Sequence, residues 1–569
     1  MPNFSRRSFM IGSSLTTGML VPAQSRRALA ALEQSAGSTP FDIRSLIDVE
    51  RNKIRASMAS EKLPGAAVCL VYEGRPIWIE GFGETDWTHG RPVSDRTIFS
   101  IQSTSKNFTA TAIMLAVQRG LLDLDEPITT YLPDFSVRSR FEPAPAGKMT
   151  LRLLLSHRAG LTHEAPVGNN YEPEFSDFET HIRSISDTWL RFPVGERYRY
   201  SNLGVDLAGY ILQTVTKTPF PEYLRTVLLD PLGMTDTTAA TDVYIRRADR
   251  ALGHATGYGL VPLKIPLIPS GGVYTSARDM ATYLRFQLNR GMVDGKIVLE
   301  ERLWREMHSF SLGGNYSLGV ARADLRYGTT SIRLLNHNGG GFGFGCVLDY
   351  YPEAQLGWAV LFNSESSAAY QFGAELLDQL LSRRFGPRKA RLPAADLALI
   401  EPQKGQLKRF LGHYIGRALS GDMKLENDRL GIQVGTAFTP FQFTSPVDMF
   451  VVDPSGEAVL ARYFPATPNE LAHSECAIGD YSLDYNDGPN DLAGPNKSSW
   501  ERFLGTYQIY QWGQPSEKVN IHRKNGYLYL NGIRLFIELE PGLFFTSDGE
   551  AVDFRDRPTW RNIPLERVT

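Results

Sequence analysis

The stretch Phe99-Ser100-Ile101-Gln102-Ser103-Thr104-Ser105-Lys106-Asn107-Phe108-Thr109-Ala110 holds the residues on which the interpretation of this chain depends. It places a serine hydroxyl and a lysine amine three positions apart, at what we predict to be the first turn of a helix. Residues at i and i+3 share one face of a helix, so the Lys106 amine can reach the Ser103 hydroxyl. Serine is a weak nucleophile unless a neighbouring base takes its proton. Backbone N–H groups at a helix N-terminus would stabilise the negative charge that then develops.

Two later segments complete a pattern that begins with this turn. They are Tyr200-Ser201-Asn202 and, after a strand-like run, His337-Asn338-Gly339-Gly340. Ser-x-x-Lys, Tyr-x-Asn and Lys/His-x-Gly in this order resemble the three motifs of the serine β-lactamase and penicillin-recognising enzyme family, class C-like. Three further segments are similar to the same family: 153–161, 223–235 and 270–280. The similarity covers about residues 40–385.

The resemblance implies a role for each motif residue. Ser103 would be the nucleophile that forms an acyl-enzyme, and Lys106 and Tyr200 would accept and return its proton. Either a neutral lysine or a tyrosine phenolate can be the base, and the sequence leaves both open. Asn202 would orient Lys106 and hydrogen-bond the amide of the substrate. The backbone N–H groups of Ser103 and Gly340 would form the oxyanion hole, and His337, Gly339 and Gly340 would, with Asn202, contact the substrate.

Two neighbouring residues compete for these roles. Ser105 is a second hydroxyl in the same turn, but no lysine lies three residues beyond it. Tyr198 would face the same side of a strand as Tyr200, and the Tyr-x-Asn spacing selects Tyr200.

The third motif bears on the substrate. β-Lactamases usually have lysine where this chain has His337, two residues before Gly339. Histidine is mostly neutral at pH 7, so it would bind a substrate carboxylate more weakly. The resemblance therefore implies a peptidase or amidohydrolase acting on short peptides, including peptides with D-residues such as cell-wall fragments or linearised cyclic peptides. The alternatives are a carboxylesterase of the same fold, then a β-lactamase, and last a non-catalytic protein that binds peptidoglycan.

The resemblance also implies an α/β (α+β) catalytic domain, with an antiparallel sheet flanked by helices and a helical subdomain. Residues 66–72 and 76–82 are typical of a β-hairpin around Glu73-Gly74. The helix that begins near Ser103 carries apolar residues at helical spacing, and strands are expected again around 330–362.

Beyond this domain the sequence repeats itself. Phe410-Leu411-Gly412-His413-Tyr414 recurs as Phe503-Leu504-Gly505-Thr506-Tyr507, and Gly456-Glu457-Ala458-Val459 recurs at the same offset as Gly549-Glu550-Ala551-Val552. Short alternating strands in each unit predict two small antiparallel β-barrels. This layout resembles the D-aminopeptidase branch of the family. The expected parts are a signal peptide at 1–30, the hydrolase domain at 31–385, a linker at 386–405, a first barrel at 406–484, a linker at 485–499 and a second barrel at 500–569.

The N-terminus and the composition bear on location and partners. Ser5-Arg6-Arg7-Ser8-Phe9-Met10 and the apolar stretch after it resemble a twin-arginine export signal, so we expect the twin-arginine machinery as a partner and a periplasmic, Gram-negative location. The apolar stretch is too short for a stable membrane anchor. A net charge of −2 gives no reason to expect nucleic acid. The histidines are scattered, and of the three cysteines Cys69 and Cys346 lie in apolar runs, so we expect no metal or cofactor. The oligomeric state stays open.

Two segments are expected to shape the mouth of the site. The stretch between Leu161 and Trp189 would roof the pocket, and its acidic side chains either attract a free amino group or belong to an ordinary solvated loop. The acidic and aromatic residues concerned are Glu164, Tyr171, Glu172, Glu174, Phe175, Asp177, Phe178 and Glu179. A loop within Tyr485–Ser499 is expected to narrow the entrance.

Overall fold

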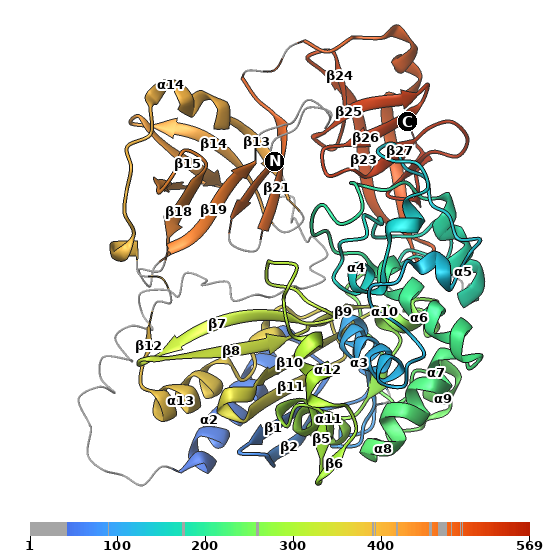
Figure 1. Ribbon diagram of the computed structural model, residues 1–569, viewed down its shortest axis with the longest axis vertical. Helices are drawn as coiled ribbons and strands as arrows, with labels where there is room; N and C mark the ends of the chain where they lie inside the picture. Colours follow the sequence, from blue (N-terminus) through green and yellow to red (C-terminus); the bar gives the residue numbers. More distant parts are fainter. Residues whose placement is uncertain are drawn as a thin grey trace.

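The computed structural model describes residues 42–568 of the chain. Within that range it does not describe positions 89, 173–176, 258–260, 390–391, 393, 417–418, 454–457, 465–474, 479–480, 490 and 492. The signal expected in residues 1–30 therefore lies outside the described residues. Three large antiparallel sheets organise the described chain, one in the catalytic part and two after it (Figure 1). Among the residues placed by the structure, no helix is long and apolar enough to cross a bilayer.

The first sheet joins the two ends of the catalytic part. Its strand order is β12-β7-β8-β10-β11-β1-β2, with β9 paired to β10. The strands are β1 Gly65–Tyr72, β2 Arg75–Gly83, β7 Ala321–Tyr327, β8 Thr330–Asn336, β9 Gly339–Gly341, β10 Phe344–Tyr351, β11 Leu356–Phe362 and β12 Arg388–Lys389. The predicted hairpin is confirmed, because β1 and β2 are joined at Glu73 and Gly74, whose φ angles of 52° and 74° suit a tight hairpin turn.

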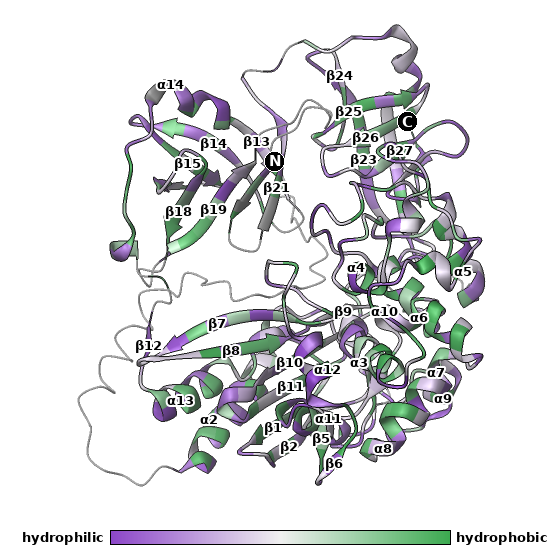
Figure 2. Ribbon diagram, viewed as in Figure 1, coloured by the Kyte–Doolittle hydropathy of each residue, from purple (hydrophilic) through white to green (hydrophobic). Residues whose placement is uncertain are grey.

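Strand β1 is buried on both faces, which explains its continuous apolar sequence. Ala66, Val68 and Leu70 belong to a core that also contains residues of α2 (Ile43–Glu61) and α13 (Ala374–Phe385). The alternate residues of β1 belong to a second core with α3 (Ser105–Gln118) and α11 (Ala277–Leu288). Helices thus cover both faces of the predicted antiparallel sheet, and Figure 2 shows its apolar strands between them. This confirms the expected catalytic fold.

Helix α3 lies between the sheet and a helical subdomain. It packs against α6, α10 and α12, and every residue from Ser105 to Ala116 is buried. A 3₁₀ turn, η1 (Gln102–Thr104), precedes it, so the predicted helix start near Ser103 is confirmed with a tighter first turn. The other helices are α4 Leu151–Leu155, α5 Phe178–Ser184, α6 Asn202–Thr216, α7 Phe220–Leu224, α8 Asp230–Leu232, α9 Thr241–Arg246, α10 Ile268–Gly271, α12 Glu301–Met307 and α14 Lys404–Leu407.

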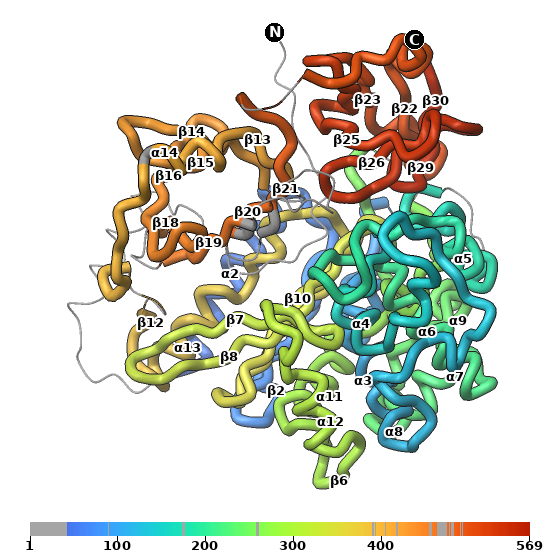
Figure 3. Tube along the Cα trace, turned by 45° about the horizontal axis from the view of Figure 1, so that its top comes forward, coloured from blue at the N-terminus to red at the C-terminus, as the bar shows by residue number. Residues whose placement is uncertain are grey.

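Two barrel-like antiparallel sheets follow, with orders β16-β15-β14-β13-β21-β20-β19-β18-β17 and β29-β28-β27-β26-β25-β24-β23-β22-β30 (Figure 3). Their strands are β13 Gly412–Ile415, β14 Ser420–Glu426, β15 Arg429–Val434, β16 Ala437–Pro440, β17 Gln442–Phe443, β18 Asp448–Val452, β19 Ala458–Phe464, β20 Glu475–Ile478, β21 Tyr481–Asp487, β22 Gly505–Gln511, β23 Gln514–Lys524, β24 Tyr527–Leu530, β25 Ile533–Glu540, β26 Leu543–Thr546, β27 Ala551–Asp553, β28 Thr559–Trp560, β29 Ile563–Pro564 and β30 Glu566–Arg567. The first repeated motif occupies the same structural position in both units. Phe410 and Phe503 are buried, and Gly412 and Gly505 begin the first strand of each sheet. In the second motif, Gly456 and Glu457 lie outside the described residues.

The segments expected to be linkers also take part in neighbouring sheets. Strand β12 extends the catalytic sheet by pairing with β7, and the Ile400 N–H donates to the Phe443 carbonyl at 2.9 Å. At the second segment, β21 continues to Asp487 and a 3₁₀ turn at Ser498–Phe503 leads into β22.

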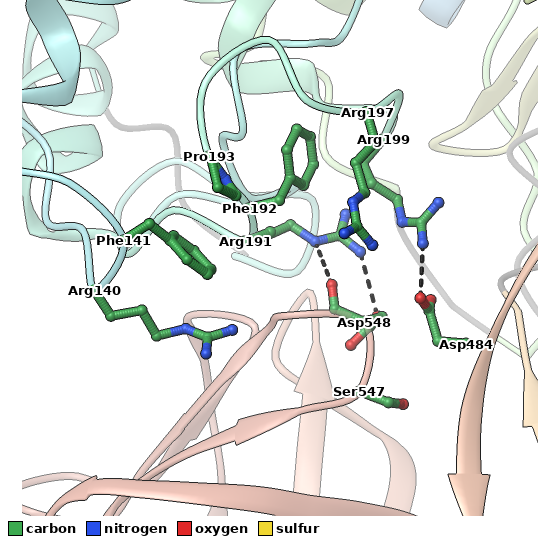
Figure 4. A pocket seen from close by; sticks show the side chains of 10 residues that line it. All are labelled: Arg140, Phe141, Arg191, Phe192, Pro193, Arg197, Arg199, Asp484, Ser547 and Asp548. Carbon is green, nitrogen blue, oxygen red and sulfur yellow. Dashed lines mark hydrogen bonds and ion pairs between the residues drawn. The ribbon is translucent and has the colours of Figure 1, made fainter. Parts of the chain in front are cut away.

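The three parts meet at a cluster of arginine and acidic side chains (Figure 4). From the catalytic part, Arg199 lies 2.8 Å from Asp484 of the first C-terminal sheet. Arg191 lies 3.4 Å from Asp548 and 3.1 Å from Glu550 of the second sheet. A cavity with about 380 Å³ of empty space lies among them. Since these groups are largely buried, removing one partner would leave a charge without compensation, and the pairs therefore fix how the parts sit together.

Candidate active site

Three adjacent hydroxyls in the motif turn have different surroundings. Thr104 donates to the His337 carbonyl at 3.0 Å, and the Ser105 hydroxyl accepts the Val273 N–H at 3.0 Å. Both side chains are fully buried. Ser103 instead lines a small cavity with about 240 Å³ of empty space. The geometry therefore favours Ser103 over its competitor Ser105 as the residue that a substrate can reach.

Lys106 lies directly beneath Ser103. Its Nζ is 3.1 Å from Ser103 Oγ and 2.8 Å from the Ser270 carbonyl oxygen, and the side chain is fully buried. The same Nζ lies 4.9 Å from the centre of the Tyr200 ring. The structure therefore brings Ser103, Lys106 and Tyr200 together, although they come from separate segments.

Tyr200 is held by the loop that enters helix α6. Ser201 caps this helix by accepting the Gly204 N–H at 3.3 Å, and its own N–H donates to His157 Nδ1 at 3.2 Å. The His157 ring lies 4.2 Å from the Tyr200 ring, between centroids. Residues 198–200 lie in this loop and not on a strand, and Tyr198 contacts the rings of His157 and Tyr316. Of the two tyrosines, the structure places Tyr200 over the lysine.

Asn202 begins helix α6 and faces the same cavity. Its side-chain oxygen is buried, and no described residue hydrogen-bonds it. Other lining residues are Gln102, Ser103, Asn170, Ile265, Leu267, Ser270, Gly271 and Gly340. None of these described lining residues carries a charge, so the cavity suits a neutral group that can donate an N–H.

The glycines of the third motif allow β9 to approach the serine turn. A Cβ at Gly339 would lie 2.0 Å from the Ile101 carbonyl oxygen and 3.0 Å from the Ser103 nitrogen. Only glycine avoids this clash, and the next residue, Gly340, lines the same cavity as Ser103. This proximity is what an oxyanion hole made by the backbone N–H groups of Ser103 and Gly340 requires.

His337, predicted to contact the substrate but to hold a carboxylate only weakly, has both ring nitrogens engaged within the protein. Its Nδ1 is 2.8 Å from the Asn338 carbonyl, which can only accept, so Nδ1 carries the proton. Its Nε2 is 2.8 Å from the Tyr316 hydroxyl and accepts from it. Burial, with the nearby Lys106 charge, lowers the pKa of His337 to about 3. The imidazole is therefore neutral, and both ring nitrogens contact the protein.

A group of buried aromatic side chains supports Tyr200. The sequence analysis did not predict that these side chains lie together. Tyr316 holds His337 and packs near the His157 ring, at 4.7 Å between centroids. Burial lowers the pKa of His157 and raises that of Tyr316, so both stay uncharged near neutral pH. His157 lies in a segment similar to the family, but Tyr316 lies in a loop with no motif.

The second C-terminal sheet also reaches the site. Trp512, in the turn between β22 and β23, donates from its indole to the Asn170 carbonyl at 3.0 Å and stacks on Phe342 at 5.3 Å. Asn170 lines the cavity with Ser103. The turn between β22 and β23 thus contacts a residue of the cavity wall, whereas within Tyr485–Ser499 the Tyr485 hydroxyl donates to Asp491. No sequence motif around Trp512 predicts this contact.

The acidic residues of the roof are engaged in local structure. Glu164 is buried and accepts from the backbone and side chain of Asn170. Glu172 accepts the Gly168 N–H, and Asp177 caps helix α5. Glu179 pairs with Arg183 on the surface. Glu174 and Phe175 lie outside the described residues. These described carboxylates therefore stabilise the local structure of the roof, which fits the ordinary loop better than recognition of a free amino group.

No cluster of three histidine, cysteine or acidic side chains suited to a metal ion occurs among the described residues. The three cysteines are buried and unbridged.

Comparison with known proteins agrees with this arrangement. The Beta-lactamase family profile matches residues 51–382, more than half of the chain. Protein flp of Staphylococcus aureus (strain COL) is 28% identical over 232 residues, which is 40% of this chain and 46% of that protein. The chain thus spans about half the length of this curated relative.

Solved structures share the fold at low identity. SurE superposes with a TM-score of 0.53 at 22% identity, over 77% of this chain and 100% of that one. The octameric penicillin-binding protein homologue from Pyrococcus abyssi gives a TM-score of 0.50 at 22% identity, over 77% of this chain and 99% of that one. The motif geometry and the matched length lead to one conclusion: the chain belongs to the Beta-lactamase family of serine hydrolases.

Proposed function

We propose that this protein hydrolyses short peptides or other small amides through an acyl-enzyme on Ser103. The observation that carries the preference for amides is the buried side-chain oxygen of Asn202, which lacks a hydrogen-bond donor among the described residues. A buried acceptor without a partner costs about 1–3 kcal/mol. The N–H of a peptide substrate would satisfy it, whereas an ester has no N–H to donate.

The proposed reaction follows from the arrangement around Ser103. Its Oγ attacks the substrate carbonyl carbon while its proton passes to Lys106 or Tyr200. The carbonyl oxygen gains negative charge, which the backbone N–H groups of Ser103 and Gly340 stabilise. The C–N bond then breaks, the amine leaves with the proton, and Ser103 remains acylated. Water attacks this ester, the acid is released, and Ser103 recovers its proton.

The absence of charge among the described lining residues bears on substrate class. A penicillin, or the C-terminal residue of a peptide, carries a carboxylate, and His337 is neutral with both nitrogens engaged. Ile265 and Leu267 give the cavity an apolar wall that suits a small side chain. Short cell-wall fragments or linearised cyclic peptides fit this description when the bond that is cut lies away from their terminal carboxylate. SurE, which shares the fold, has been solved with D-Leu, so the stereochemistry of the substrate belongs in the test.

A carboxylesterase is the second candidate, because the uncharged cavity, with its apolar wall of Ile265 and Leu267, would also accept the acyl group of an ester. The two candidates differ in how they use Asn202. If an amide N–H binds the Asn202 oxygen, Asn202→Ala will lower kcat/KM for an amide and leave an ester much less affected.

A panel of four substrates tests the proposal: a D-amino-acid p-nitroanilide, its L-counterpart, a p-nitrophenyl ester and nitrocefin. We expect Asn202→Ala to lower kcat/KM for the better anilide about tenfold or more, and for the ester less than about threefold. Equal losses on both would contradict the amide preference. Ester turnover without anilide turnover would identify an esterase, and rapid nitrocefin turnover would identify a β-lactamase.

We also infer export by the twin-arginine machinery to the periplasm. The support is the segment Ser5-Arg6-Arg7-Ser8-Phe9-Met10 with the apolar residues after it. Replacing Arg6 and Arg7 by lysine should keep the full-length protein in the cytoplasmic fraction. Unchanged periplasmic recovery of that variant would contradict the inference.

A further inference from the structure

A buried carboxylate behind Lys106 holds the backbone that this lysine contacts. Asp206 of α6 is fully buried. Its Oδ1 accepts the Ser270 N–H at 2.9 Å, and its Oδ2 accepts the Ser270 hydroxyl at 2.9 Å. The Ser270 carbonyl, in turn, accepts from Lys106 Nζ at 2.8 Å. Asp206 therefore fixes Ser270 by its backbone and its side chain, while the third polar atom of Ser270 points at the lysine.

A histidine from the roof completes the environment of Asp206. His181 of α5 is also fully buried, and its Nδ1 donates to the Val167 carbonyl at 2.9 Å. Its Nε2 lies 3.4 Å from Asp206 Oδ2. Burial lowers the pKa of His181, but the hydrogen bond and charge of Asp206 outweigh burial and place this pKa above its ordinary value. The carboxylate thus has partners on both oxygens, as a buried charge requires.

Helix α6 explains why Asp206 stands at this position. Asn202 and Asp206 are four residues apart, so they lie on the same face of the helix. Asn202 faces the cavity, and Asp206 meets Ser270, another residue that lines it. Aspartate is an unfavourable residue inside a helix, and burying its charge costs several kcal/mol before compensation. A role in holding the short helix α10 in place accounts for that cost.

We propose that Asp206 is a positioning residue: by fixing Ser270, it holds the Lys106 amine within reach of the Ser103 hydroxyl. This inference rests on the proposed function, in which Lys106 takes part in proton transfer. Because one N–H of the amine is bound to the Ser270 carbonyl, the rest of the amine faces Ser103 Oγ at 3.1 Å. Without Asp206, Ser270 would lose both of these restraints and the lysine would lose its fixed acceptor.

The rate of acylation of the full-length protein by a fluorophosphonate probe tests the proposal without knowledge of the substrate. The limiting rate, kinact, depends on the position of Lys106, whereas the half-saturating concentration, KI, depends on entry to the cavity. We expect Asp206→Ala to lower kinact about 100-fold, the scale of a 1 Å misplacement, with KI changed less than about threefold. If Asp206→Ala is insoluble, Asp206→Ser, too short to bind both Ser270 groups, replaces it.

The conservative variant Asp206→Asn separates positioning from charge. Its carbonyl can accept the Ser270 N–H, while its amide can donate to the Ser270 hydroxyl and to a neutral His181. We therefore expect Asp206→Asn to keep kinact within about tenfold of the wild type.

Asp279→Ala is the matched control. Asp279 is another buried aspartate of the same domain, and it accepts the Asp236 N–H at 2.8 Å and the Thr237 hydroxyl at 2.7 Å. We expect Asp279→Ala to lower the stability of the protein but to leave kinact within about threefold of the wild-type value. If the wild type is acylated and Asp206→Ala reacts equally fast, the positioning role is overturned. It is also overturned if Asp206→Asn is as slow as Asp206→Ala, or if Asp279→Ala is equally slow. A wild type that is not acylated would instead overturn the proposed function.

Discussion

At the scale of single residues, burial decides which of several similar side chains is available for chemistry. Ser103 and Ser105 lie in the same turn, but the Ser105 hydroxyl is bound to the Val273 N–H and has no exposed surface. The Ser-x-x-Lys spacing predicts the same choice, because a lysine follows only Ser103 at three residues.

His337 shows where residue type alone is insufficient. Its sequence position predicts contact with the substrate and weak binding of a carboxylate, whereas its two hydrogen bonds go to Asn338 and Tyr316. Tyr316 lies on a loop remote from every motif, so no local pattern indicates that it reaches the imidazole. Local spacing can predict contacts within one turn of helix, but not contacts made by the packing of distant loops.

The titration of His337 gives a prediction for stability. An unfolded histidine has a pKa near 6.5, and burial lowers the folded pKa to about 3. Between these values the unfolded chain binds a proton that the folded chain does not, so the free energy of unfolding falls as the pH falls. We expect the wild type to lose up to about 1.4 kcal/mol per pH unit more than His337→Gln below pH 6.5. Urea unfolding from pH 7 to pH 5 measures this difference. Parallel pH profiles would contradict it.

At the scale of elements, helix α3 and the β22–β23 turn contrast in predictability. The helix has apolar residues at helical spacing, and its start and its burial follow from that pattern. Its polar residues are buried too, since the helix is covered on all sides, and Thr109 donates to the Pro269 carbonyl. No sequence pattern predicts the contacts of the β22–β23 turn, because those contacts depend on where the whole sheet packs against the catalytic part.

The turn predicts a specific effect on substrate size. Trp512 stacks on Phe342 and donates to the carbonyl of Asn170, which lines the cavity. Trp512→Ala removes this support of the cavity wall, so kcat/KM for an anilide with a bulky side chain should rise relative to a small one, roughly tenfold. Steady-state kinetics on the two anilides measures the ratio. Tyr510→Ala, which removes a half-exposed side chain of the neighbouring strand, is the control and should leave the ratio unchanged. An unchanged ratio in Trp512→Ala would show that the turn does not limit substrate size.

At the scale of the whole molecule, the two C-terminal sheets contact the catalytic part next to its functional loops. Arg199 precedes Tyr200 directly and is bound to Asp484. The sequence repeat predicts two β units, but it contains no information on which charges they bring to the junction. Those pairs join residues at least 285 positions apart, which spacing rules do not address.

The junction predicts that the parts depend on each other for stability. Asp484→Ala leaves the buried Arg199 with less compensation, and we expect the free energy of unfolding to fall by about 3 kcal/mol. Urea unfolding of the full-length chain measures this change. The control is Asp230→Ala, which breaks an exposed pair with Arg225 and should cost less than about 1 kcal/mol. Equal stability of the two variants would contradict a structural role for the junction.

Formation of a covalent intermediate on Ser103 can be measured by mass spectrometry after fluorophosphonate treatment. We expect one adduct on Ser103 in the wild type and in Ser105→Ala, and no adduct in Ser103→Ala. A wild-type adduct on another residue, or labelling that persists in Ser103→Ala, would show that Ser103 is not the nucleophile.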